Sequence, residues 1–154
     1  GAVVVVLLRL HAPHVRQIFR RYFGEMIRDH EEFNLLGSTY LLLAGLLAIE
    51  IFPKPLAAAA LGFTVLGDAF AAMVGKAWGR TRVFRKTVEG TAGCLIACLA
   101  WAAFLAGAGH APWGTVLVGA LAASLVEFLP IPLHDNLGIT PASGYAMKLL
   151  WMPG

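Results

Sequence analysis

The sequence predicts an all-α integral membrane protein that forms a polytopic helical bundle in a single membrane domain. Of its 154 residues, 58% are hydrophobic and 14% are charged, whereas a soluble domain carries about 25% charged residues. Backbone groups in lipid must be hydrogen-bonded within their own segment, so long apolar runs are expected to be helices. We therefore expect about five full transmembrane helices. Their predicted ranges are 35–52, 56–75, 91–108, 113–130 and 138–152.

The N-terminal part differs from these spans. Residues 1–8 are apolar but shorter than the roughly 20 residues that cross a bilayer. They predict a partial span, which is typical of a trimmed N-terminus rather than of a signal peptide. Residues 9–34 interleave five arginines with apolar side chains at helical spacing. This pattern predicts an amphipathic helix that lies in the membrane interface.

The distribution of basic residues predicts the orientation of the bundle. Segment 9–34 and loop 76–90 each contain five Lys or Arg residues, and two predicted spans separate them. Both should therefore lie on one side, and the positive-inside rule makes that side cytoplasmic. By parity, loop 131–137 lies there as well. We expect a catalytic bundle over 35–152 in a prokaryotic inner or plasma membrane, with its active site facing the cytoplasm.

Asp68 is a carboxylate inside the second predicted span. Such residues are costly in lipid and usually functional, and they face a partner or a water-filled cavity. Helical spacing places Asp68, Ala72 and Gly75 near one face that leads toward loop 76–90. The functional interpretation is a Mg²⁺ ligand or a base for a hydroxyl group. The alternative is a structural hydrogen bond to a neighbouring helix.

Loop 76–90 combines cations with glycine and leads into the next predicted helix. The free N–H groups and the positive dipole at a helix N-terminus favour phosphate binding. Glu89 would hold a metal that bridges phosphates, or it would be a first-turn carboxylate favoured by the helix dipole. The candidate residues for nucleotide and phosphate binding in this loop are Lys76, Arg80, Lys86, Thr87 and Gly90.

The third group of polar residues follows the fourth span. Glu127 is a second acid within an apolar span, and the prolines after it stop the helix. Asp135 and Asn136 then offer hard oxygen ligands, although such residues also cap helices. We interpret Asp68, Glu89 and Asp135 as candidate catalytic and metal-binding acids. Asn136 joins the nucleotide-binding set, and Glu127 is a further candidate.

These residues are suited to phosphoryl transfer, which needs mainly positioning and charge neutralisation. The sequence has no Walker-type loop and no protein-kinase motif, which excludes the design of a soluble nucleoside triphosphatase.

Three segments carry a family resemblance. LGDAFAAMVGKAWGR (66–80), KTVEG (86–90) and LPIPLHDN (129–136) occur in this order, and residues 28–43 add a similar upstream segment. Together they resemble the dolichol kinase family, which includes CTP-dependent diacylglycerol kinases, phytol kinases and bacterial and archaeal relatives. The resemblance covers about 28–152. At position 134 this chain has His where the family pattern would have an acid.

The resemblance implies a lipid-metabolic enzyme that transfers the γ-phosphate of CTP to a membrane lipid alcohol with Mg²⁺ or Mn²⁺. The alcohol would be of the polyprenol, diacylglycerol or phytol type. Carried over by motif, Lys86 and the backbone near Gly90 would hold phosphate, while Asp68, Glu89 and Asp135 would hold metal or activate the hydroxyl.

Two alternative functions stay open. Phosphatidate cytidylyltransferases have a similar arrangement of acid, glycine and KTxEG but a different C-terminal part. A non-enzymatic membrane scaffold or a transporter fragment is the other alternative. The expected partners are a lipid alcohol, a nucleotide and the bilayer, with no nucleic acid. The small-residue helix faces would also permit a homodimer.

Overall fold

A computed structural model describes residues 37–83, 86–130 and 135–151, apart from the side chains at positions 37, 38, 135 and 136. The predicted partial span over 1–8 and the predicted interfacial helix over 9–34 lie outside these ranges. The chain divides into two compact units at Leu43, and the helical packing between α4, α5, α6 and α7 lies within the second unit, which begins at Ala44.

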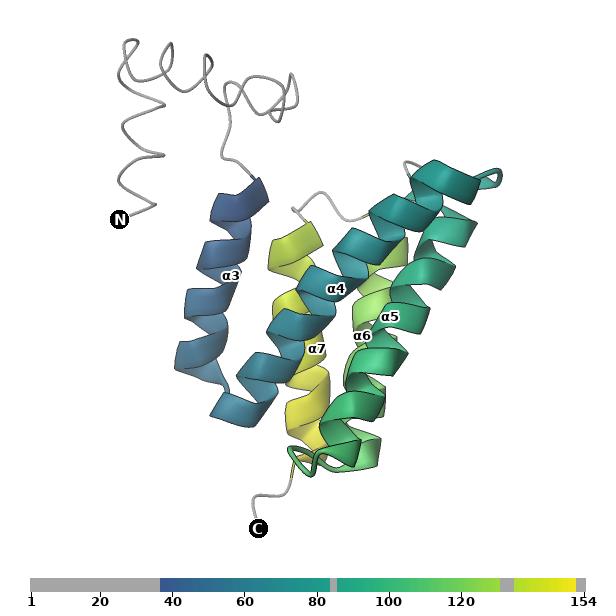
Figure 1. The fold of residues 1–154 in the computed structure, drawn as a ribbon. Coiled ribbons are helices and arrows are strands. Elements are labelled where there is room, and N and C mark those ends of the chain that lie inside the picture. The colour runs from purple at the N-terminus through teal and green to yellow at the C-terminus, as the bar shows by residue number, and fades with distance from the viewer. Residues whose placement is uncertain (1–36, 84–85, 131–134, 152–154) are drawn as a thin grey trace, which may run out of the picture. The chain divides into compact units, whose positions relative to one another are not determined.

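Helices contain 84% of the described residues, so the predicted all-α class is confirmed for this part of the chain. Each predicted apolar segment corresponds to one helix, and α5 and α7 begin three residues earlier than expected. The helices run from one end of the bundle to the other (Figure 1). In chain order, the elements are α3 (Gly37–Ile51), α4 (Lys54–Trp78), β1 (Arg82–Val83), β2 (Lys86–Thr87), α5 (Val88–Gly107), α6 (Trp113–Phe128) and α7 (Asp135–Leu150).

Two helices, α4 and α5, are long and apolar enough to cross a membrane. The helices α3, α6 and α7 contain 15, 16 and 16 residues. At 1.5 Å per residue, such helices reach about 24 Å, against a hydrocarbon core about 30 Å thick. Length and composition therefore support two candidate spans among the described residues, rather than the five full spans that were predicted.

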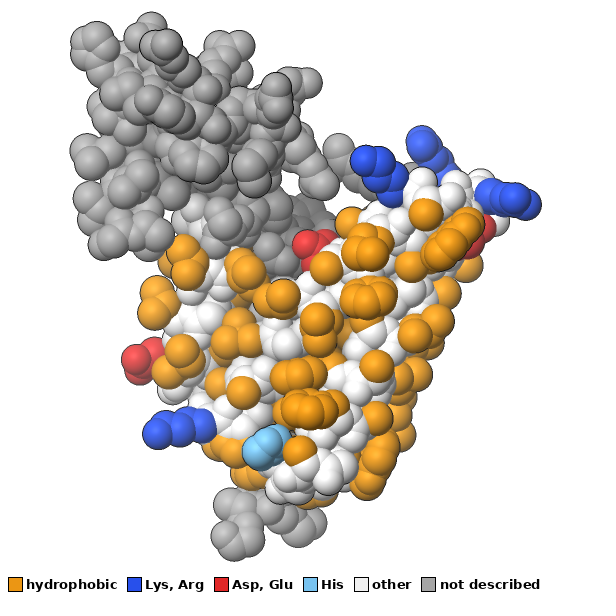
Figure 2. Space-filling view, in the orientation of Figure 1, with side chains coloured by type: hydrophobic (Ala, Val, Ile, Leu, Met, Phe, Trp, Pro, Cys, Tyr) orange, Lys and Arg blue, Asp and Glu red, His pale blue; other side chains and the backbone are white. Residues whose placement is uncertain are grey.

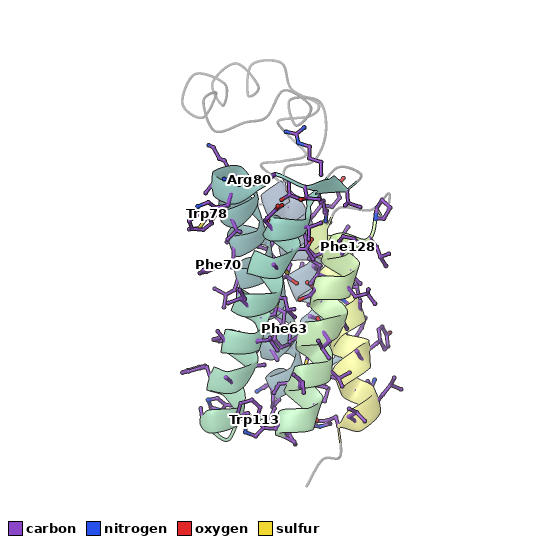
Figure 3. The ribbon with its side chains drawn as sticks, turned by 90° about the vertical axis from the view of Figure 1, so that its right-hand side faces the viewer. Phe63, Phe70, Trp78, Arg80, Trp113 and Phe128 are labelled. Atoms are coloured by element: carbon purple, nitrogen blue, oxygen red, sulfur yellow. The ribbon has the colours of Figure 1, made fainter. Side chains whose placement is uncertain are left out.

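Helix α4 packs against α5, α6 and α7. Phe63 of α4 lies fully buried at the centre of this packing, together with Val116, Ile139 and Met147 from α6 and α7 (Figure 3). The outer surface of the helices is also apolar (Figure 2). A helix that is hydrophobic on all sides suits burial in a larger protein or in a membrane.

Small residues permit the close contact between α4 and α5, as expected for helices that pack in lipid. A Cβ atom at Gly90 would lie 2.9 Å from the carbonyl oxygen of Ala71 and 3.3 Å from the Cα of Gly75. At Gly62, a Cβ atom would overlap the indole ring of Trp101. Between α4 and α7, the Oγ1 atoms of Thr64 and Thr140 form a 2.7 Å hydrogen bond.

Gly62→Ala should destabilise the bundle by about 1–3 kcal/mol, because the added methyl group overlaps the Trp101 ring and forces it to move. The matched control is Gly114→Ala in α6, where a Cβ atom meets nothing within 4 Å. Unfolding of both variants in detergent measures the difference. Equal stability of the two variants would contradict this account of the α4–α5 contact.

Candidate functional site

The connection between α4 and α5, predicted as a loop, contains a short β-hairpin. Its strands pair antiparallel, with Arg82 opposite Thr87 and Val83 opposite Lys86. The N–H of Val88 donates to the carbonyl oxygen of Thr81 at 3.0 Å, which extends the hairpin to the first residue of α5. Lys86 and Thr87 are therefore held in a strand directly before the helix N-terminus.

Thr87 is the N-cap of α5. Its hydroxyl oxygen accepts a hydrogen bond from the N–H of Gly90 at 3.1 Å, which is the usual role of a threonine at this position. A Cβ atom at Gly75 would lie 2.9 Å from the same hydroxyl oxygen. The predicted phosphate-binding residues Thr87 and Gly90 thus share one tightly packed turn against the last part of α4.

Glu89 lies in the first turn of α5, as predicted. The backbone N–H of Thr81 donates to both of its carboxylate oxygens, at 3.1 and 3.2 Å. This contact connects the start of α5 to the start of the hairpin. Glu89 therefore has a structural contact in the described part of the chain, and its proposed contact with a metal stays a prediction.

Lys86 and Glu127 form a buried ion pair. Lys86 Nζ lies 2.9 Å from Glu127 Oε2, and the two side chains are 21% and 7% exposed. The pair joins the hairpin to the last turn of α6. Sequence reasoning named both residues separately and missed their contact. Two observations from the sequence could have indicated this contact. An acid within an apolar span needs a partner, and both residues were predicted to lie near the same end of the bundle.

The same end of the bundle carries exposed cations. Lys76, Arg80 and Arg82 are all exposed, and Figure 2 shows basic side chains gathered at the end of α4 that leads into the hairpin. Arg80 lies at this end of the bundle in Figure 3. Such an arrangement attracts anions, because cations gathered at one end of a molecule raise the local concentration of an anionic ligand.

The structure describes the side chains of two of the three predicted acids, Asp68 and Glu89. Asp68 is exposed on α4, whereas Glu89 contacts the hairpin. The described residues include no group of three or more His, Cys, Asp or Glu residues placed to hold a metal. Asp135 begins α7, but the side chains of Asp135 and Asn136, and all of His134, lie outside the described part.

Comparison with known proteins gives no match for this chain among protein-family models, curated proteins or solved structures.

A double-mutant cycle tests the Lys86–Glu127 pair. Lys86→Met and Glu127→Gln should each lower the free energy of unfolding by about 3–5 kcal/mol, because each removes one partner of a buried ion pair. The double variant that combines Lys86→Met with Glu127→Gln should lose less than the sum of the two single losses, since it removes both charges. Denaturation in detergent measures all three. Strictly additive losses would mean that the two residues do not interact.

Proposed function

We propose that this protein is a membrane-embedded lipid-alcohol kinase that uses CTP, with its site at the hairpin end of the bundle facing the cytoplasm. The observation that carries the proposal is the placement of a basic hairpin, with its buried Lys86–Glu127 pair, at one end of an apolar helical bundle. Such a site brings cations to the boundary where a lipid hydroxyl and a soluble nucleotide can meet.

Phosphoryl transfer requires positioning of the reactants and stabilisation of charge on the transferred group. Lys76 and Arg80 would bind the phosphates of the nucleotide, since both are exposed at this end. Thr87 and Gly90 would hold the N-terminal turn of α5 in place for the same phosphates. Asn136 is proposed to contact the nucleotide from the start of α7.

Lys86 would contribute a point charge whose position is set by Glu127. The contact at 2.9 Å limits the movement of the lysine side chain. Preorganised charges stabilise a transition state without reorganising during the reaction. We therefore assign Glu127 a positioning role toward Lys86 rather than direct contact with substrate.

Asp68, Glu89 and Asp135 are the acids proposed to hold Mg²⁺ or Mn²⁺, which would neutralise charge on the phosphoryl group. Carboxylate oxygens suit these hard cations, and Mg²⁺ needs only one or two protein carboxylates when substrate phosphates supply further oxygens. In the proposed step, the lipid hydroxyl oxygen bonds to the γ-phosphorus and the bond between that phosphorus and the β–γ bridging oxygen breaks. CDP leaves, and one of these three acids that does not hold the metal would accept the hydroxyl proton.

Radiolabelled CTP tests the reaction class. The purified chain, incubated with Mg²⁺ and a mixed lipid-alcohol extract, should transfer label to lipid from γ-labelled CTP and not from α-labelled CTP. Chromatography of the labelled product would identify the alcohol. Transfer of the α label would instead indicate a cytidylyltransferase, and transfer of neither label would contradict the kinase proposal.

Asp68→Asn should reduce turnover by at least about 100-fold, the scale seen when one electrostatic stabiliser is removed from an active site. The matched control is Glu50→Gln, which makes the same chemical change at an exposed position of α3. Rates with saturating CTP, measured alongside thermal unfolding, separate lost chemistry from lost fold. A folded Asp68→Asn variant with full activity would remove Asp68 from the mechanism.

A further inference from the structure

An apolar groove lies between α4 and α5, away from the hairpin. Its volume is about 440 Å³, which is within the range of roughly 300–1,000 Å³ found for small-molecule sites. All the side chains that line it are hydrophobic. Leu66 and Phe70 contribute from α4, while Ile96, Trp101 and Phe104 contribute from α5.

Packing beneath the groove holds the Trp101 side chain in place. Its indole N–H donates to the carbonyl oxygen of Ala59 at 3.3 Å, which satisfies its polar atom. The ring stacks on Phe104 with centroids 5.3 Å apart and an interplanar angle of 19°. The ring fits against α4 because residue 62 is glycine, and a side chain at this position would overlap the ring. The aromatic wall is therefore formed before any ligand arrives.

The position of the groove connects it to the basic end of the bundle. It lies on α4 and α5, the two helices that are long and apolar enough to cross a membrane. Ile96 is eight residues after Val88, the first residue of α5, or about 12 Å at 1.5 Å per residue. Phe70 lies on the same side of the bundle as Trp78 near the end of α4 (Figure 3).

The two regions together are complementary to an amphiphile. An anionic or phosphorylated head would meet the exposed Lys76, Arg80 and Arg82. An extended chain from that head, running along α4 and α5, would enter a groove that offers it no polar side chain. Purely apolar lining selects hydrocarbon over a polar ligand, since burying a polar group without a hydrogen bond is costly.

We propose that this groove binds the hydrocarbon chain of the lipid alcohol, and of its phosphorylated product, while the head lies at the hairpin. This proposal rests on the proposed function and adds a substrate subsite to it. The positions of Trp101 and Phe104 determine which part of the hydrocarbon chain contacts the protein. Alcohols whose chains are too short to reach Ile96 gain nothing from the groove.

Fluorescence quenching tests the subsite without any measurement of activity. One full-length variant retains Trp101 as its sole tryptophan and another retains Trp113, which is 59% exposed on α6 and does not line the groove. A long-chain primary alcohol brominated in the distal half of its chain should quench Trp101 saturably. The unbrominated alcohol should reverse that quenching, whereas Trp113 should show neither effect.

A variant in which a larger side chain fills the groove provides a second test of the proposal. Ala100 lines the groove at an exposed position, and Ala58 of α4 is exposed but does not line it. Ala100→Phe should weaken binding of the long-chain alcohol about tenfold, within the range for a changed hydrophobic pocket contact. Ala58→Phe, the matched control, should leave binding unchanged. In the label-transfer assay, Ala100→Phe should raise KM for the long-chain alcohol, whereas Ala58→Phe should leave that KM unchanged.

The two proposals fail in different ways. Phosphorylation of lipid without saturable quenching of Trp101 would overturn the groove proposal and leave the kinase proposal intact. Saturable quenching without phosphorylation would support the groove and contradict the kinase. A change in oligomeric state on Ala100→Phe, with no quenching of Trp101, would show that a second copy of the chain covers the groove, and would also overturn the proposal.

Discussion

The Lys86–Glu127 ion pair is the contact on which the polar end of the bundle depends. It joins β2 to the last turn of α6 across a largely apolar interior. Removing two charges from water is costly, and their close contact offsets that cost only with good geometry. Because α4 ends just before the hairpin and α5 begins directly after it, the pair also restrains where these two helices end and begin.

Glycine packing extends this restraint along α4 and α5. Close contact at Gly75 and Gly90 places the Thr87 cap against α4, and farther along the helices Gly62 accommodates the Trp101 ring. The same helix pair therefore forms a polar end and an apolar groove at different depths. A change at either glycine contact would alter the spacing between the proposed phosphate site and the proposed chain site.

The helices were predictable because long apolar runs identify them without knowledge of their neighbours. The hairpin was not, since strands of two residues that contain Arg82 and Lys86 show no alternating apolar pattern. The first turn of α5 was correctly placed at Glu89, but the hydrogen bonds from Thr81 depend on the hairpin. The pairing of Lys86 with Glu127 likewise depends on how α6 packs, which no local spacing encodes.

The distribution of polar and apolar groups supports placing this bundle in lipid. Large side chains such as Ile96, Leu125 and Leu149 are exposed on the outside, while the Lys86–Glu127 charges are inside. Monomeric soluble proteins rarely expose extensive apolar surface. In a bilayer this distribution is favourable, and α4 and α5 are the two described helices that are long and apolar enough to cross one.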